Sequence, residues 1–154
     1  MPSGDEALLR QAIALSRRSR HEGNHPFGAL VVDPGGTVIA EGLNSHSKSP
    51  LEHAEMNALR DALKRTATGG LAGATLYSSA EPCAMCAGAL YWSGIGCVVY
   101  ALSERRLLEL TGADLRNPTL SLPCREVFAR GQRAIEVVGP LLEDEAADVH
   151  RGFW

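Results

Sequence analysis

Three residues of metal-binding type and one acidic residue stand at short, regular spacings in this chain. Glu55 follows His53 by two residues, and Pro82 leads a Cys-x-x-Cys pair made by Cys83 and Cys86. One imidazole and two thiolates suit Zn²⁺, and three protein ligands leave one coordination position open to water. An open position is typical of catalytic zinc, because structural zinc is closed by a fourth ligand. The spacing therefore predicts a catalytic zinc held by His53, Cys83 and Cys86.

Glu55 is placed to move protons for that water without binding the metal itself. Zinc lowers the pKa of a bound water from about 15.7 to roughly 7, so a nucleophile is available at neutral pH. Glu55 can take a proton from the water and pass it to a ring nitrogen and then to a leaving amine. This predicts hydrolytic release of ammonia from an amidine-like ring carbon. This pattern resembles the signature of zinc nucleobase deaminases.

Two other interpretations of the cysteine pair are a structural zinc module and a redox pair. A structural zinc would need a fourth ligand, and a redox pair would leave His53 and Glu55 unexplained. Cys97 lies in an apolar run and is expected to be a buried free cysteine, whereas Cys124 is expected in a loop without a role. The residues without ligand spacing are His21, His25, His46, His150, Cys97 and Cys124.

Hydrophobic periodicity predicts alternating helices and strands around these residues. The turn residues at 33–36 favour a hairpin, Ser103 is a candidate N-cap, and the first helix is expected to start at Ser3 or Gly4 and end at Gly23. Residues 44–50 and 111–123 are expected to be irregular, and the second helix to stop before Gly69. Helices are predicted at residues 5–22, 51–64, 84–92 and 103–110 and near the acidic C-terminus, and strands at residues 27–32, 38–41, 75–79, 95–101 and 134–138.

This alternation predicts an α/β fold, a three-layer αβα domain with a five-stranded mixed sheet. Residues 1–154 are expected to form a single domain, because the length suits one core and no linker divides the chain. His53 and Cys83 then lie at the starts of two helices separated by one strand. Two helix N-termini can therefore converge on one ion, and their dipoles favour thiolates.

Composition limits the location and the partners of the protein. No apolar run approaches the roughly 18 residues that a membrane helix needs, and the N-terminal residues lack the pattern of a signal peptide, so we expect a cytoplasmic protein. The formal net charge is −3, whereas nucleic-acid binders usually carry a basic patch. The charge therefore favours a small-molecule substrate over a nucleic acid.

The chain resembles the cytidine-deaminase-like superfamily from its first helix to about residue 140. The segments that carry the resemblance are Pro26-Phe27-Gly28-Ala29, Glu41-Gly42-Leu43-Asn44, His53-Ala54-Glu55-Met56-Asn57-Ala58-Leu59-Arg60 and Ser79-Ala80-Glu81-Pro82-Cys83-Ala84-Met85-Cys86-Ala87-Gly88-Ala89. The resemblance implies a zinc-dependent deaminase. It also implies a homodimer with the active site near the subunit interface.

Two branches of the superfamily are most similar, bacterial guanine deaminase and bacterial tRNA adenosine deaminase. Phe27, the Tyr91-Trp92 pair and the acidic, aromatic C-terminus favour the guanine branch, which implies conversion of guanine to xanthine and ammonia. The resemblance gives Asn44 and the main chain of Ala54 a role in seating the ring. It implies base stacking or core packing for Phe27, and substrate or subunit contact for Trp92 and Trp154.

Asp114 is a candidate acceptor for the guanine 2-amino group. It stands in Thr111-Gly112-Ala113-Asp114, where guanine deaminases carry a Gly-Phe-Asp-Asp-like segment. This difference leaves cytosine, a nucleoside or a triazine open as substrate, besides tRNA adenosine. The sequence also does not determine whether the substrate is a free base or a nucleoside. Nor does it determine whether the two subunits of a dimer exchange their C-terminal elements.

Overall fold

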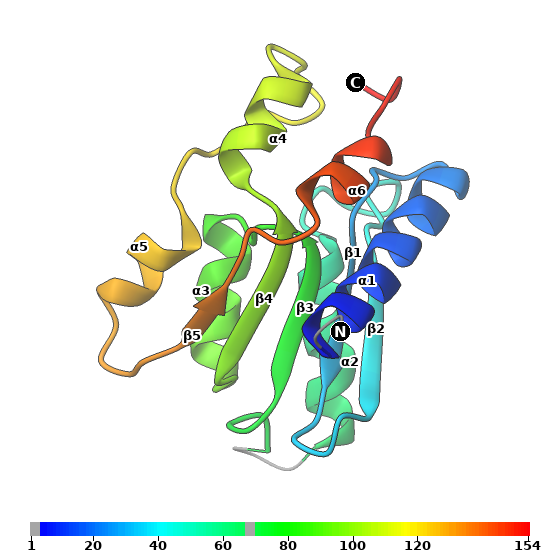
Figure 1. The fold of residues 1–154 in the computed structure, drawn as a ribbon. Helices are drawn as coiled ribbons and strands as arrows, with labels where there is room; N and C mark the ends of the chain where they lie inside the picture. The colour runs from blue at the N-terminus through cyan, green and yellow to red at the C-terminus, as the bar shows by residue number, and fades with distance from the viewer. Residues whose placement is uncertain (1–3, 67–69) are drawn as a thin grey trace.

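A five-stranded sheet runs through the centre of the computed structural model, which describes residues 4–66 and 70–154 (Figure 1). The strand order is β2-β1-β3-β4-β5; β1 is antiparallel to β2 and β3, whereas β3, β4 and β5 are parallel. The mixed sheet expected from the sequence is confirmed. The strands are β1 (Gly28–Val32), β2 (Val38–Leu43), β3 (Thr75–Ala80), β4 (Cys97–Leu102) and β5 (Glu136–Val138).

Helices cover both faces of the sheet and complete the predicted three layers (Figure 1). The long helix α1 and the short helix α6 lie on one face, and α2 and α3 lie on the other, with α5 packed against α3. Helix α4 follows β4 directly and lies at the same end of the sheet as the C-terminus. The bounds are α1 (Gly4–His21), α2 (Ala54–Arg65), α3 (Ala84–Ser93), α4 (Glu104–Thr111), α5 (Cys124–Ala129) and α6 (Glu143–Asp148).

The strand sequences explain why the sheet is covered twice. In β1 every residue is buried, and alternate residues enter different cores: Val31 packs on the α2 and α3 side, and Leu30 packs on the α1 side. Val98 and Val99 of β4 divide in the same way. Because successive side chains of a strand point to opposite faces, a continuous apolar run requires a layer on each face.

The predicted hairpin and the Ser103 cap are confirmed, since β1 pairs with β2 and the N–H of Arg106 donates to Ser103 Oγ at 3.2 Å. The second helix begins at Ala54 instead of residue 51. Ser3 and Gly69, expected at a helix start and beyond a helix end, lie outside the described residues.

Two expectations about cysteines are corrected. Cys124 is fully buried at the start of α5, a helix of six residues that the sequence analysis missed because its apolar pattern is too short to show a period. Cys97 is half-buried, since it is the first residue of β4 and lies at the end of the sheet. Within the described ranges, no helix is both long enough and apolar enough to cross a membrane.

Candidate active site

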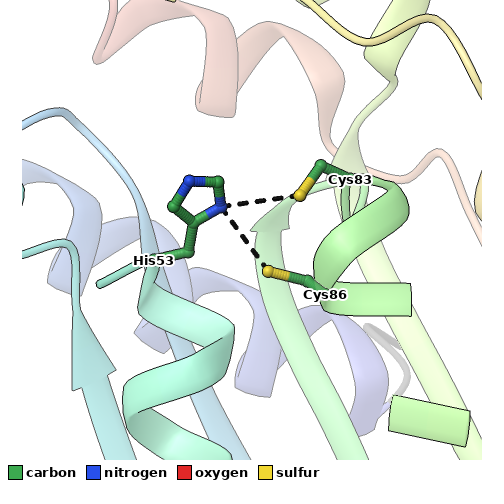
Figure 2. A group of neighbouring side chains, drawn as sticks. All are labelled: His53, Cys83 and Cys86. Carbon is green, nitrogen blue, oxygen red and sulfur yellow. Dashed lines mark hydrogen bonds between the residues drawn. The ribbon is translucent and has the colours of Figure 1, made fainter. Parts of the chain in front are cut away.

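His53, Cys83 and Cys86 converge between the N-termini of α2 and α3 (Figure 2). The Nδ1 atom of His53 lies 3.5 Å from the Sγ atom of each cysteine, and the three atoms lie within 4.8 Å of one another. Tetrahedral bonds of about 2.0 Å to nitrogen and about 2.3 Å to sulfur would separate those atoms by roughly 3.5 Å. The spacing and the chemistry of the donors therefore fit a zinc ion.

The local sequence brings these ligands to the helix starts. His53 and Cys83 are the extended N-cap residues of α2 and α3, and Cys86 follows in the first turn of α3. Gly42 of β2 lets α2 approach, because a Cβ at this position would collide with the carbonyl oxygen of Ala54. A larger residue at Gly42 would push away the start of α2 and with it His53.

The pKa values of the three residues depend on one another, and among the three only the pKa of Cys83 falls. The hydrogen bond from Cys86, followed by that from His53, lowers the pKa of the Cys83 thiol to about 4. The contact with Cys83 raises the pKa of Cys86 well above its ordinary value, and the pKa of His53 also rises through its hydrogen bond with Cys83. A thiolate at a helix N-terminus is a reactive, metal-binding form of cysteine.

Glu55 lies beside this group in the first turn of α2, and only 6% of its surface is exposed. Burial, followed by the nearby charge of Cys83, raises the pKa of its carboxyl to about 7. Glu55 lines the same cavity as His53 and Cys83. A carboxyl in this position can hold or release a proton next to the metal ligands.

The cavity above the ligands has a volume of about 340 Å³. Among the predicted substrate residues, Phe27 and Asn44 line it. Asn44 is buried, and its Oδ1 accepts the backbone N–H of His46 at 2.9 Å. The side-chain oxygen is thereby occupied, and the Nδ2 amide remains available as a donor.

The remaining predicted contacts lie elsewhere in the described chain. Ala54 is fully buried at the start of α2 and does not line the cavity. Trp92 is 85% exposed near the end of α3 and is also outside the cavity lining. The carboxylate of Asp114 holds the guanidinium of Arg116, with Nη2 to Oδ2 at 2.6 Å, and does not line the cavity.

Trp154 closes a cluster of rings beside the cavity. Its Nε1–H donates to Nδ1 of His150 at 2.9 Å, and its ring meets His25 edge to face at 5.3 Å between centroids. His25 in turn stacks on His46 at 4.2 Å, and both of these histidines line the cavity. The C-terminal segment therefore supports the cavity wall through His25, although Trp154 is not itself a lining residue.

Sequence reasoning missed several lining residues, above all Glu104, Arg116, His25 and His46. Glu104 is buried at 7% exposure, and burial, followed by the charge of Cys83, raises the pKa of its carboxyl to about 8. Its position directly after an N-cap serine is typical of an ordinary first helical turn. The sequence offered no signal that this side chain reaches the cavity.

Comparison with known proteins shows the family to which this fold and site belong. Residues 2–102 match the zinc-binding region of cytidine and deoxycytidylate deaminases. The chain therefore belongs to that family, and it is a zinc-dependent hydrolytic deaminase. The suspected family resemblance is confirmed.

Individual relatives divide between several substrates. The chain is 42% identical to a probable cytosine deaminase of Schizosaccharomyces pombe, over 97% of this chain and 92% of the relative. It is 41% identical to the guanine deaminase of Bacillus subtilis, over 62% of this chain and 63% of the relative. A solved structure described as guanine deaminase from Nitrosomonas europaea has a TM-score of 0.78 and 32% identity, over 95% and 82% of the two chains.

Proposed function

We propose that the protein deaminates a free nucleobase by hydrolysis and that the base is guanine, which gives xanthine and ammonia. The observation that carries the proposal is the cavity, which joins a zinc ligand set and a buried carboxyl to an aromatic ring and an amide donor. The likeness to the guanine deaminase of Nitrosomonas europaea over nearly the whole chain supports guanine as the base.

His53, Cys83 and Cys86 would hold the zinc ion, and Glu55 would carry the proton. Zinc at this site supplies Lewis acidity and makes a water nucleophilic at neutral pH. As the water oxygen bonds to C2 of guanine, Glu55 takes the water proton and delivers it to ring N3. Glu55 then carries the second proton to the departing amine, which leaves as ammonia. Its burial next to His53 supports this role.

Asn44 and Phe27 would place the ring. Since Asn44 Oδ1 already accepts the His46 N–H, its free Nδ2 amide suits an acceptor on the base, such as a carbonyl oxygen or an unprotonated ring nitrogen. Phe27 lines the cavity and presents an aromatic surface that can pack on a planar ring. These two residues would orient the purine so that C2 faces the metal ligands.

Cytosine is the second candidate, because the relative from Schizosaccharomyces pombe aligns with 97% of this chain. As a substrate, transfer RNA is less compatible than a free base with the negative charge of this chain. The tRNA-specific adenosine deaminase of Bacillus subtilis is 30% identical over 97% of this chain, yet α6 here begins with Glu143, Asp144 and Glu145, and the formal net charge is −3. Although Arg10 and Arg106 pair with Glu145 and Asp144, the net negative charge differs from the basic surface with which RNA binders attract phosphates.

One ammonia-release panel tests these alternatives. It contains guanine, cytosine, adenine, their nucleosides, a triazine and a tRNA anticodon stem-loop, each assayed with the zinc-loaded protein. We expect the highest kcat/KM with guanine. Activity with cytosine but not with guanine would overturn the choice of base, and activity with the stem-loop alone would overturn the whole small-molecule proposal.

The homodimer is a further part of this proposal. Trp92 exposes 85% of its surface and stands edge to face with Tyr91 at the end of α3, so a large apolar ring is available for a second copy. Light scattering after size exclusion should give twice the chain mass, and Trp92→Ser should reduce it. A monomeric parent protein would refute this assembly. The cytoplasmic location and the single domain stay predictions.

A further inference from the structure

Glu104 is the first residue of α4, and its backbone is held in place from two sides. Its N–H donates to Oε1 of Glu81 at 3.0 Å, and the preceding residue, Ser103, caps the helix. The side chain lines the cavity together with Glu55 and Cys83. The position of its carboxyl is therefore set by a fixed helix start.

The carboxyl of Glu104 has no hydrogen bond or ion pair with another residue within 4–66 and 70–154. In the same part of the chain, no fully buried side-chain polar atom lacks a partner, so the Glu104 oxygens are open to the cavity. Burying a carboxyl without a partner is costly, and a ligand that donates to it recovers that cost.

Within the described residues, no arginine or lysine forms an ion pair with the Glu104 carboxyl. Arg116 is the one arginine or lysine among the cavity-lining residues of the described chain, and its guanidinium is bound to Asp114 and to the carbonyl oxygen of Phe153. The cavity thus presents an amide donor at Asn44 and a free acceptor at Glu104. A ring that carries both an acceptor and an N–H donor complements this pair.

We propose that Glu104 is a specificity-determining residue whose carboxyl group accepts, through its carbonyl oxygen, a hydrogen bond from a ring N–H of the substrate. The assignment rests on the proposed function, because it takes the nucleobase as the ligand of this cavity. It places a carboxyl contact with the substrate ring at Glu104, whereas the sequence suggested a contact between Asp114 and the 2-amino group; the Asp114 carboxylate is occupied by Arg116. If the N–H is the one that a sugar replaces in a nucleoside, the same contact also excludes nucleosides.

The test combines two variants with substrates that each lack one ring N–H. Glu104→Ala removes the acceptor, and Glu104→Gln keeps a carbonyl acceptor in the same shape. Glu109→Gln is the matched control, because Glu109 is exposed on the same helix. Each protein is assayed on guanine and on 1-methyl-, 7-methyl- and 9-methylguanine. Zinc content and circular dichroism establish that the variants are loaded and folded.

Removal of this hydrogen bond should lower kcat/KM of Glu104→Ala for guanine by about 3- to 10-fold. Glu104→Gln should show a smaller fall in kcat/KM for guanine, and Glu109→Gln should have the same kcat/KM as the parent protein. One methylated guanine should be slow with the parent and no slower with Glu104→Ala, since the N–H that it lacks is the partner of Glu104. If the role of Glu104 were merely structural, the substitution would lower kcat/KM for every substrate by the same factor.

The proposal is overturned if Glu104→Ala stays within about twofold of the parent on guanine, or if its loss is equal on all four substrates. Failure of the proposed function is separate: the parent would then release no ammonia from guanine. If the parent instead releases ammonia from cytosine, the same variants are compared on cytosine and 1-methylcytosine. If no base reacts, dissociation constants measured by calorimetry replace the rates and decide the role of Glu104.

Discussion

Replacing Glu81 by glutamine should destabilise the protein, because its carboxylate joins three elements behind the metal site. One oxygen accepts the N–H of Glu104 at the start of α4, and the other accepts the N–H of Cys124 at the start of α5, both at 3.0 Å. Glu81 also stands two residues before Cys83 and is 8% exposed. It therefore links two helix starts to the loop that carries the cysteine ligands.

The magnitude follows from these two contacts. Hydrogen bonds to a charged group contribute about 1.5–3 kcal/mol each, and a buried donor left without a partner costs about 1–3 kcal/mol. Glutamine keeps one carbonyl acceptor but turns an NH₂ group toward the other backbone N–H. Loss of the Glu81 charge also relieves repulsion on Glu104, whose raised pKa is partly due to it. We therefore expect a net loss of about 2–4 kcal/mol of unfolding free energy.

Urea unfolding of the zinc-loaded proteins measures this loss directly. For a chain of this size, about 2–4 kcal/mol corresponds to a fall in Tm of roughly 5–15 °C. Glu126→Gln, at an exposed position of α5, is the matched control and should change the unfolding free energy by less than about 0.5 kcal/mol. Hydrogen exchange should show faster exchange at the amides of Glu104 and Cys124.

A Glu81→Gln protein as stable as the control would contradict the role of Glu81, because it would mean that the two backbone donors find other partners at no cost. Equal exchange rates at both amides in the variant and the parent would lead to the same conclusion.

Three further results are expected. Glu55→Gln should lower kcat about 10²- to 10⁴-fold with zinc content unchanged, as shown by ammonia release and elemental analysis; an active variant would remove Glu55 from the proton path. Cys86→Ser should lose zinc on dialysis, because the fully buried thiol is one of the three ligand groups, and retention of stoichiometric zinc would contradict the ligand set. Burial, the first cause at both residues, lowers the pKa values of His25 and His150 to about 4. Because the unfolded state binds protons below pH ~6.5 and the folded state does not, stability should fall between about pH 6.5 and pH 4, with His150 alone accounting for about 3 kcal/mol at pH 4. Urea titrations across this range check the slope, and a His150→Gln variant with the same slope as the parent would rule out the contribution of His150.

The sequence alone determined most of the elements and the candidate metal-binding residues, because both depend on local patterns. Apolar runs of strand length imply two covered faces, as β1 and β4 show. A Cys-x-x-Cys pair at a helix start brings its sulfurs together within one turn, whatever the rest of the fold. His53 and Glu55 are both positioned by the start of α2, His53 as its extended N-cap and Glu55 in its first turn.

Tertiary structure decided which polar side chains enter the cavity, since that depends on how distant segments pack. Asp114 is engaged by Arg116, whose guanidinium also holds the C-terminal segment through Phe153, whereas Glu104 is left open to the cavity. Trp92 looks outward because α3 buries Cys86, Ala87 and Leu90 on its other side and packs against α2 and α5. No local spacing encodes these outcomes. They follow from contacts between residues far apart in the chain, and such contacts leave no periodic trace in the sequence.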